Sequence, residues 1–225
     1  MQKLIRILHN RRLLIYTGTG AAMILVIIAV ILIVRIAGAD DMQPEPRIVT
    51  LTIDMPDDIP LEEKEQIIYN SLLEAGFSSA GACGIMGNIA VESPDYDTAA
   101  VNESTGALGL FQWTNDGDRQ QKMKDYCRDQ KLNWNSIEAQ LGFAIYELSG
   151  GDPIACRLDD FLRQTDNSYA AAAEFTVGFE RCITDSGRSA DRYMGQLYPE
   201  FYGEYYQGLS RRINKAMNYY IRFNE

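Results

Sequence analysis

A single glutamate, Glu92, stands where an apolar helical run meets a loop rich in glycine and aspartate. The run must end by Ser93, because Pro94 disfavours a helical conformation in the residue before it. A carboxylate in the last turn of such a helix meets the negative end of the helix dipole, and apolar neighbours withdraw its water, so both effects raise its pKa. A general acid working near neutral pH needs a raised pKa. Glu92 is therefore the candidate catalytic acid, against the commoner alternative of a solvated glutamate at a helix end.

The loop from Asp95 to Gly109 offers candidates for a second carboxylate. Its Asp, Asn, Ser, Thr and Gly content is typical of turns or of a small irregular hairpin. Asp97 and Glu103 are the carboxylates available to assist an attacking water molecule as a base, and the sequence does not rank them. Residues 106–113, GALGLFQW, add small residues, aromatic rings and an amide, which suit contact with a sugar ring and its N-acetyl group.

Histidine is almost missing from this chain. The single histidine, His9, precedes a long apolar run that is expected to cross the membrane. Without an exported histidine there is no Cys–His or Ser–His nucleophile pair and no His-ligated zinc outside the cell. We therefore expect chemistry based on carboxylates, with no metal and no cofactor.

Several motifs in the same order resemble the signature of phage tail lysozymes. They are Glu92-Ser93, then Ala100-Val101-Asn102, then residues 106–113, matching the pattern ES, A-x-N/S and GA-x-GL-x-QW. Residues 82–89 fit the approach to the catalytic glutamate, and residues 179–181 (FER) resemble a later Y-E-R-P segment. The resemblance spans residues 65 to 195. This family is part of the lysozyme-like superfamily, with goose-type lysozymes and lytic transglycosylases.

The resemblance implies that Glu92 is the acid that cleaves peptidoglycan glycan strands. It implies a mainly α, lysozyme-like α+β fold, in which a small irregular β region lies beside the cleft. The substrate-binding candidates are Ser93, Asn102, Gly109, Leu110, Phe111, Gln112, Trp113 and Glu180. Two departures from the family pattern bear on the site: Cys182 stands where proline is usual, and Asp95 and Asp97 replace an Asn-Pro pair.

Three functional interpretations remain open. A muramidase would hydrolyse the MurNAc–GlcNAc linkage, with Glu92 as the acid and a second carboxylate activating water. A lytic transglycosylase would instead use the C6 hydroxyl of the sugar and leave a 1,6-anhydro end. The third possibility is a non-catalytic module that binds peptidoglycan or serves as a structural part of a larger protein assembly. The intact motifs favour an enzyme.

A transmembrane helix is expected at residues 13–34. This stretch carries no charge, and about 22 residues span a hydrocarbon core of about 30 Å. Four basic residues precede it, so residues 1–12 form a cytoplasmic tail and the rest of the chain lies on the cell-wall side. Ala37-Gly38-Ala39 has the form of a signal-peptide cleavage site, an alternative that also exports the domain.

The exported part divides into a linker, a catalytic domain and an extension. The linker is residues 35–61, rich in proline and acids; the lysozyme-like domain is residues 62–199; the Tyr-rich helical extension is residues 200–225. Apolar periodicity predicts helices at 61–76, 78–92, 116–130, 136–149, 153–163, 167–182 and 211–222. The last of these is amphipathic with a basic face.

The net charge of the exported part limits the classes of molecule that it can bind. After the first 35 residues the chain has 16 Lys and Arg against 31 Asp and Glu, a formal charge of −15, which repels nucleic acid. The expected partners are glycan strands, the membrane, and components of a conjugation, secretion or phage apparatus.

Four exported cysteines allow three disulfide pairings. Cys156 with Cys182 is favoured, whereas Cys83 is expected to be a buried free thiol.

Overall fold

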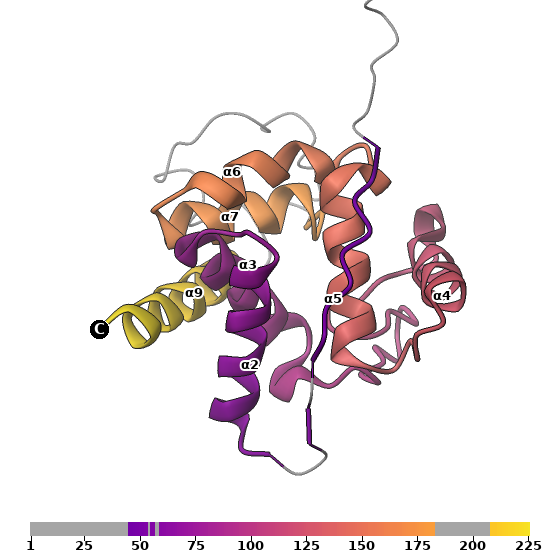
Figure 1. Cartoon of the computed structure of the whole chain (residues 1–225), viewed down its shortest axis with the longest axis horizontal. Helices are drawn as coiled ribbons and strands as arrows, with labels where there is room; N and C mark the ends of the chain where they lie inside the picture. Colours follow the sequence, from indigo (N-terminus) through magenta and orange to yellow (C-terminus); the bar gives the residue numbers. More distant parts are fainter. Residues whose placement is uncertain (1–44, 54, 57–58, 183–207) are drawn as a thin grey trace, which may run out of the picture. The chain divides into compact units, whose positions relative to one another are not determined.

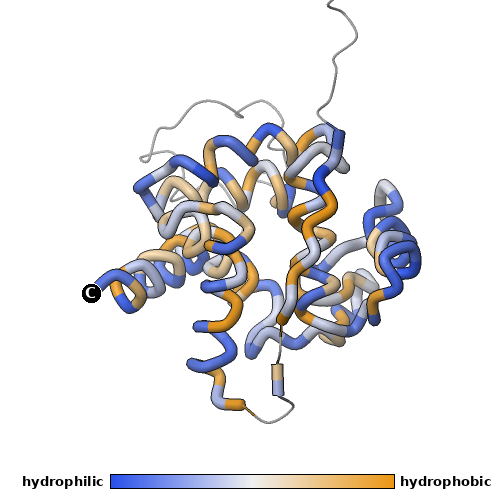
Figure 2. The backbone as a smooth tube through the Cα atoms, viewed as in Figure 1, coloured by the Kyte–Doolittle hydropathy of each residue, from blue (hydrophilic) through white to orange (hydrophobic). Residues whose placement is uncertain are grey.

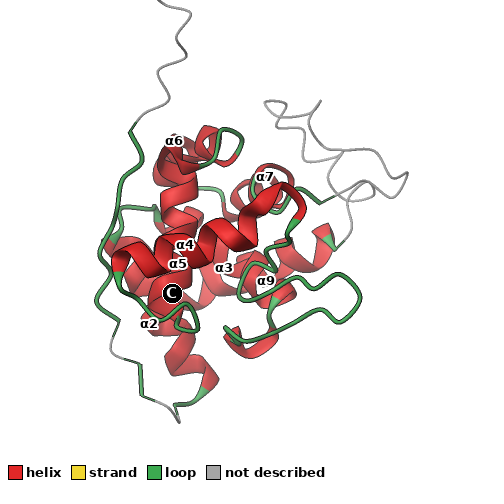
Figure 3. Ribbon diagram, turned by 90° about the vertical axis from the view of Figure 1, so that its right-hand side faces the viewer, coloured by secondary structure: helices red, strands yellow, loops and turns green. Residues whose placement is uncertain are grey.

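The described part of the chain is mainly helical, as predicted. The computed structural model describes residues 45–53, 55–56, 59–182 and 208–225. Figures 1 and 3 show helices joined by turns and loops. The helices are α2 (Leu61–Glu74), α3 (Ser79–Glu92), α4 (Arg119–Gln130), α5 (Ile137–Tyr146), α6 (Asp159–Gln164), α7 (Ser168–Gly178) and α9 (Leu209–Asn224). Short helical turns lie between them: η1 (Pro94–Tyr96), η2 (Asp116–Asp118), the π turn η3 (Glu147–Gly151) and η4 (Ala155–Leu158).

Two predicted features lie outside the described residues. These are the transmembrane helix at residues 13–34, with the cytoplasmic tail before it, and the boundary between residues 199 and 200. Over the residues that are described, no helix combines the length and apolar character needed to cross a bilayer.

Helix α3 carries Glu92 and is buried along most of its length. It begins where the sequence predicted, because the Ser78 side chain caps it by accepting a hydrogen bond from the Gly81 N–H at 3.0 Å. It ends at Glu92, two residues before Pro94. The predicted position of Glu92 in the last turn of a buried helix is therefore confirmed.

Two glycines of α3 allow neighbouring helices to approach closely. A Cβ atom on Gly84 would lie 2.4 Å from the Cβ of Ala171 in α7. A Cβ atom on Gly87 would lie 2.6 Å from the backbone oxygen of Arg212 in α9. Real Cβ atoms do not tolerate such distances, so larger residues would force the helices apart. The small residues thus bring α9 to the turn that carries Glu92.

Helices α7 and α9 complete the packing around α3. The four alanines of α7, residues 170–173, are all buried, which confirms the predicted closely packed helix. Helix α9 is amphipathic, as predicted, and apolar and polar residues alternate along it (Figure 2). Its buried face is Leu209, Arg212, Ile213, Ala216 and Tyr219. This C-terminal helix packs against α3 and α7 and shares their core.

The loop after α3 contains little β structure. Two isolated antiparallel bridges pair Val101 with Leu108 and Leu108 with Trp113. Among the described residues there is no longer strand (Figure 3). The predicted irregular β region is therefore a pair of bridges within turns.

Residues 45–53, which we call the N-terminal strap, run alongside α5 (Figure 1). The Arg47 N–H donates a hydrogen bond to the Ser149 hydroxyl at 2.9 Å, and Leu51 is only 6% exposed. The strap lacks regular secondary structure but packs on the core. This part of the predicted linker thus belongs to the folded domain.

All four cysteines are free. Cys83 is a buried thiol, as predicted, but the predicted Cys156–Cys182 disulfide is wrong. The two thiols have different surroundings: Cys156 lies near Asp152, whereas Cys182 lies near the Arg212 guanidinium.

Candidate active site

Glu92 is the partly exposed member of a cluster of charged groups. Its side chain is 20% exposed and forms an ion pair with Arg212 of α9, whose side chain is 6% exposed. Glu92 therefore has a cationic neighbour that the sequence did not predict, in addition to the apolar residues of α3. The cause is the tight packing of α9 on α3, which places a guanidinium against the carboxylate.

Arg212 is fixed by a second contact deeper in the core. Its Nη1 donates to the side-chain oxygen of Asn88, one helical turn before Glu92, at 3.0 Å. Asn88 is itself held by hydrogen bonds from its amide to the Gly84 and Ala172 carbonyls, and by the Thr176 hydroxyl at 2.9 Å. The position of the cation that faces Glu92 is thus set by helices α3 and α7 together.

Glu180 supplies a second carboxyl group to the cluster. It follows α7, and its N–H donates to the Phe175 carbonyl at 3.0 Å. Its Oε1 atom is buried and has no hydrogen-bond partner among the described residues. Burial, and after it the negative charge of Glu92, raise the pKa of Glu180 well above its usual range, against the opposing charges of Arg212 and Arg119. Glu92 and Glu180 therefore both lie in the field of Arg212.

Ser93 and Asp97 shape the loop that leaves α3. Ser93 is fully buried, and its hydroxyl donates to the Asp97 carbonyl at 2.7 Å. The Asp97 side chain accepts a hydrogen bond from the Ala99 N–H at 2.8 Å. Ser93 thus fastens the loop from inside, and Asp97 uses its carboxylate to stabilise a turn.

Asn102 and Glu103 lie on the exposed tip of this loop. The Asn102 side-chain oxygen accepts hydrogen bonds from the N–H groups of Ser104 at 3.0 Å and Thr105 at 3.3 Å. This is the turn chemistry typical of asparagine. The structure shows no contact between Glu103 and Glu92 among the described residues.

The segment Gly109 to Trp113 is mostly core. Leu110 and Trp113 are fully buried, Phe111 is 2% exposed, and only Gln112 is partly exposed. The Gln112 amide donates to the Gly109 carbonyl at 3.0 Å, so it closes the turn on itself. The aromatic rings of this motif support the loop from below, and Gln112 is the side chain left to meet a ligand.

Gly109 is required by geometry. Its φ is +81°, and a Cβ atom there would lie 2.4 Å from the Gln140 side-chain oxygen. That oxygen accepts a hydrogen bond from the Leu110 N–H at 2.8 Å. The glycine therefore lets a buried glutamine hold the turn against α5.

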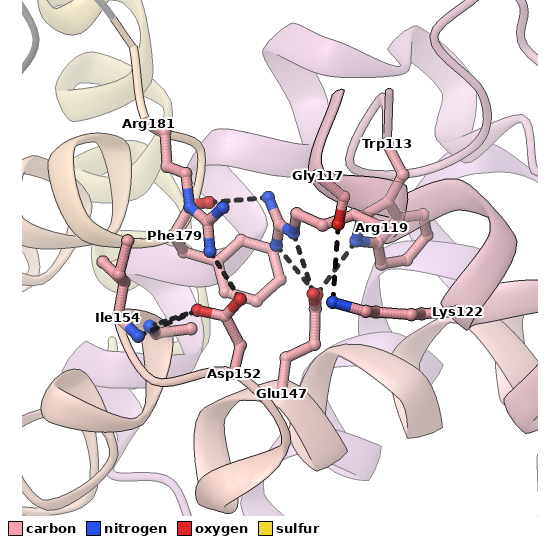
Figure 4. Close-up of polar contacts among 10 residues, drawn as sticks. Trp113, Gly117, Arg119, Lys122, Glu147, Asp152, Ile154, Phe179 and Arg181 are labelled. Atoms are coloured by element: carbon pink, nitrogen blue, oxygen red, sulfur yellow. Dashed lines mark hydrogen bonds and ion pairs between the residues drawn. The ribbon is translucent and has the colours of Figure 1, made fainter. Parts of the chain in front are cut away.

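A second ionic cluster includes Phe179 and Arg181, the two residues that flank Glu180 in the sequence, and is drawn in Figure 4. Arg119 donates through Nε and Nη2 to both oxygens of Glu147, each at 2.8 Å, and through Nη1 to the Phe179 carbonyl at 3.0 Å. The Trp113 indole N–H donates to Glu147 at 2.9 Å. Arg181 pairs with Asp152 at 2.6 Å. This cluster ties α4, η3 and the end of α7 together and fixes the residues on both sides of Glu180.

Arg212 was not among the site residues predicted from the sequence. The arginines of the final helix were expected to form its basic face. The missing signal was the spacing, because Arg212 falls on the same helical face as Leu209, Ile213, Ala216 and Tyr219. A charged residue on an apolar face needs a buried partner, and Glu92 is that partner.

The fold and the site define a class: a helical, lysozyme-like domain with a glutamate at the end of its buried central helix. The sequence pattern of the phage tail lysozyme family matches residues 63–223. The chain therefore belongs to the phage tail lysozyme family, and the suspected resemblance is confirmed. No curated protein sequence matches the chain significantly. Membership indicates a lysozyme-type glycosidase with a role in peptidoglycan cleavage.

Proposed function

We propose that this protein cleaves the MurNAc–GlcNAc linkage of peptidoglycan, with Glu92 as the residue that donates the proton. The observation that carries the proposal is the position of Glu92. It ends a rigid buried helix, it is partly exposed, and it lies beside a second carboxyl group and an arginine that is itself fixed. A catalytic acid must be both accessible to substrate and held in place.

Glu92 and Glu180 are the two neighbouring carboxyl groups from which the proton for cleavage can come. Burial, and after it the negative charge of Glu92, raise the pKa of Glu180 and favour its protonated form. The Glu92 side chain is 20% exposed, whereas the Oε1 atom of Glu180 is buried, so we assign delivery of the proton to Glu92. Arg212 must release Glu92 before the donation and then stabilises the carboxylate that remains.

The fate of the sugar cation distinguishes two enzymes. In a muramidase, water attacks the oxocarbenium-like centre, and Asp97 or Glu103 would serve as the base only if the loop moved them toward the substrate. In a lytic transglycosylase, the C6 hydroxyl of the sugar attacks, and Glu92 takes its proton. We propose the hydrolytic route, with Ser93, Asn102 and the 109–113 segment shaping the loop and Gln112 contacting the sugar.

The test is product analysis. The full chain and its Glu92→Gln variant are incubated with purified Gram-positive sacculi, and the released muropeptides are identified by mass spectrometry. We expect reducing ends from the parent chain and at least about a 100-fold lower rate from the variant. Products with 1,6-anhydro ends would show that the enzyme is a lytic transglycosylase and not a hydrolase. Binding of sacculi without release, or equal release by Glu92→Gln, would overturn the catalytic proposal in favour of a binding or assembly module.

We further propose that the enzyme is anchored by residues 13–34, with its domain on the cell-wall side, where it opens the wall locally for a conjugation, secretion or phage-type machine. The support is the uncharged segment and the basic residues before it. Fractionation and protease treatment of intact protoplasts test this. Recovery of the chain in the membrane, with the domain digested from outside, is expected; a freely released domain would contradict it.

A further inference from the structure

A groove lies against the same turn of α3 that carries Glu92. Its volume is about 330 Å³, at the lower end of the range of about 300–1,000 Å³ for ligand pockets. One wall is apolar and comes from the end of α3 and the start of η1: Ala90, Val91 and Pro94. The other wall is polar and comes from the exposed face of α9: Arg211, Asn214, Lys215 and Asn218.

The polar wall is an ordered arrangement on one helix. Its residues recur at intervals of three and four, so their side chains share the face beside α3. The neighbouring face, with Arg212, Ile213 and Ala216, is buried against α3 and α7. Because α9 packs against α3 and α7, the helix positions that carry the two cations and two amides are fixed relative to α3.

The sign of the charge in this groove is opposite to that of the chain. The protein has a formal net charge of −10, yet the described residues that line the groove include no carboxylate. Neither Arg211 nor Lys215 has a carboxylate within ion-pair distance in the part of the chain that the structure describes. Asp95, which follows Pro94, is not one of the lining residues. Within the described residues these two cations have no carboxylate partner, and they are therefore available for an anionic ligand.

We propose that this groove is a subsite for a carboxylate-bearing part of the glycan strand, bound next to the bond that Glu92 cleaves. The inference rests on the proposed function and adds the preferred form of the substrate. The apolar wall faces a sugar ring, the Asn214 and Asn218 amides meet hydroxyl and N-acetyl groups, and Arg211 and Lys215 pair with the carboxylate. Strands that carry carboxylates are therefore favoured over neutral N-acetylglucosamine polymers.

The experiment measures binding separately from cleavage. Fluorescently labelled strands are titrated into the full chain carrying Glu92→Gln, with and without Arg211→Gln and Lys215→Gln together. Three probes are used: strands with their stem peptides, strands stripped of peptides so that the lactyl carboxylates are free, and neutral N-acetylglucosamine oligomers. A matched control, Lys122→Gln with Arg128→Gln on α4, removes the same two charges from exposed positions elsewhere.

We expect the groove variant to lose about tenfold in affinity for the carboxylate-bearing strands, since two partly exposed charge contacts contribute that much. The loss should shrink at high salt because such contacts are screened. Neutral oligomers should bind the groove variant and its parent equally. A preference for peptide-bearing or for stripped strands identifies which carboxylate occupies the groove.

An equal loss in the α4 control, or an equal loss on neutral oligomers, would overturn the subsite. Failure of the subsite and failure of the proposed function give different results in this experiment. A chain that releases no muropeptides but binds carboxylate-bearing strands through Arg211 and Lys215 keeps the subsite and loses the enzyme. A chain that cleaves peptidoglycan with the groove variant as active as the parent keeps the enzyme and loses the subsite.

Discussion

The ion pairs Arg119–Glu147 and Arg212–Glu92 differ in how many of their polar atoms have hydrogen-bond partners. In the pair Arg119–Glu147, both carboxylate oxygens and all three groups of the guanidinium are occupied. In the pair Arg212–Glu92, the Nε of Arg212 is buried without a partner among the described residues, and Oε1 of nearby Glu180 is equally unpartnered. A saturated network fixes structure, whereas an unsaturated one keeps capacity to exchange protons and partners. We therefore assign the first pair to the scaffold and the second to the chemistry.

The same substitution in the two pairs should give opposite results. Glu147→Gln replaces one acceptor oxygen by an NH₂ group that faces the Arg119 guanidinium, leaving a buried charge without compensation. We expect a loss of about 3–5 kcal/mol in the free energy of unfolding. Glu92→Gln keeps an oxygen toward Arg212 and should cost only about 1–2 kcal/mol, while activity is lost. Urea unfolding and muropeptide release, measured on both variants, test these two expected results.

The assignment has a clear counter-result. If folded Glu147→Gln protein lost its specific activity as completely as Glu92→Gln, both pairs would belong to the catalytic machinery. If Glu92→Gln destabilised the domain as much as Glu147→Gln, both would be structural.

The N-terminal strap should act on stability through the scaffold pair. Arg47 bonds to Ser149 in η3, the turn that carries Glu147, and Leu51 is buried against the core. Leu51→Ala should lower the free energy of unfolding by about 2 kcal/mol, at the low end for buried leucine. The specific activity of the folded enzyme should not change. The control Ile48→Ala, at a position 55% exposed, should leave stability unchanged; equal losses would mean that the strap does not depend on Leu51.

The sequence predicted most of the helices because their signals are local. Ser78 and Pro94 mark the ends of α3, and the run of alanines marks the packing of α7. The place of Glu92 followed from those ends. Its ion-pair partner did not, because Arg212 is 120 residues away and only tertiary packing joins them. The same limit applies to Trp113, which looked available to a sugar until the fold placed Glu147 beneath it.

Glu180 should make the stability of the domain depend on pH. Its pKa in the folded state lies well above the ordinary value of 4.5, so the folded state holds this proton more tightly than the unfolded state. The associated stability is complete below pH 4.5 and is lost as pH rises through the folded pKa. Glu180→Gln removes that loss. The stability of the variant relative to the parent should rise above pH 4.5 by up to about 1.4 kcal/mol per pH unit.

Unfolding curves from pH 4 to pH 9 on both proteins measure this difference. Because Glu180 belongs to the unsaturated cluster, an equal pH dependence for Glu147→Gln would erase the contrast between the two pairs. A constant difference between Glu180→Gln and the parent would show that Glu180 keeps an ordinary pKa.

The thiols should show the smallest effect, because neither cluster relies on them. Burial raises the pKa of Cys182, beside the Glu92 cluster, to about 12, and the pKa of Cys127, in α4, to about 11. Since only the thiolate reacts, a mild thiol reagent at pH 8 should leave Cys127 and Cys182 unmodified in the folded chain. Cys156, which like Cys182 is partly exposed, should be labelled first. The melting temperature should be the same with and without a reducing agent, because all four cysteines are free. A lower melting temperature after reduction would reveal a disulfide and would restore the Cys156–Cys182 pair that the structure argues against.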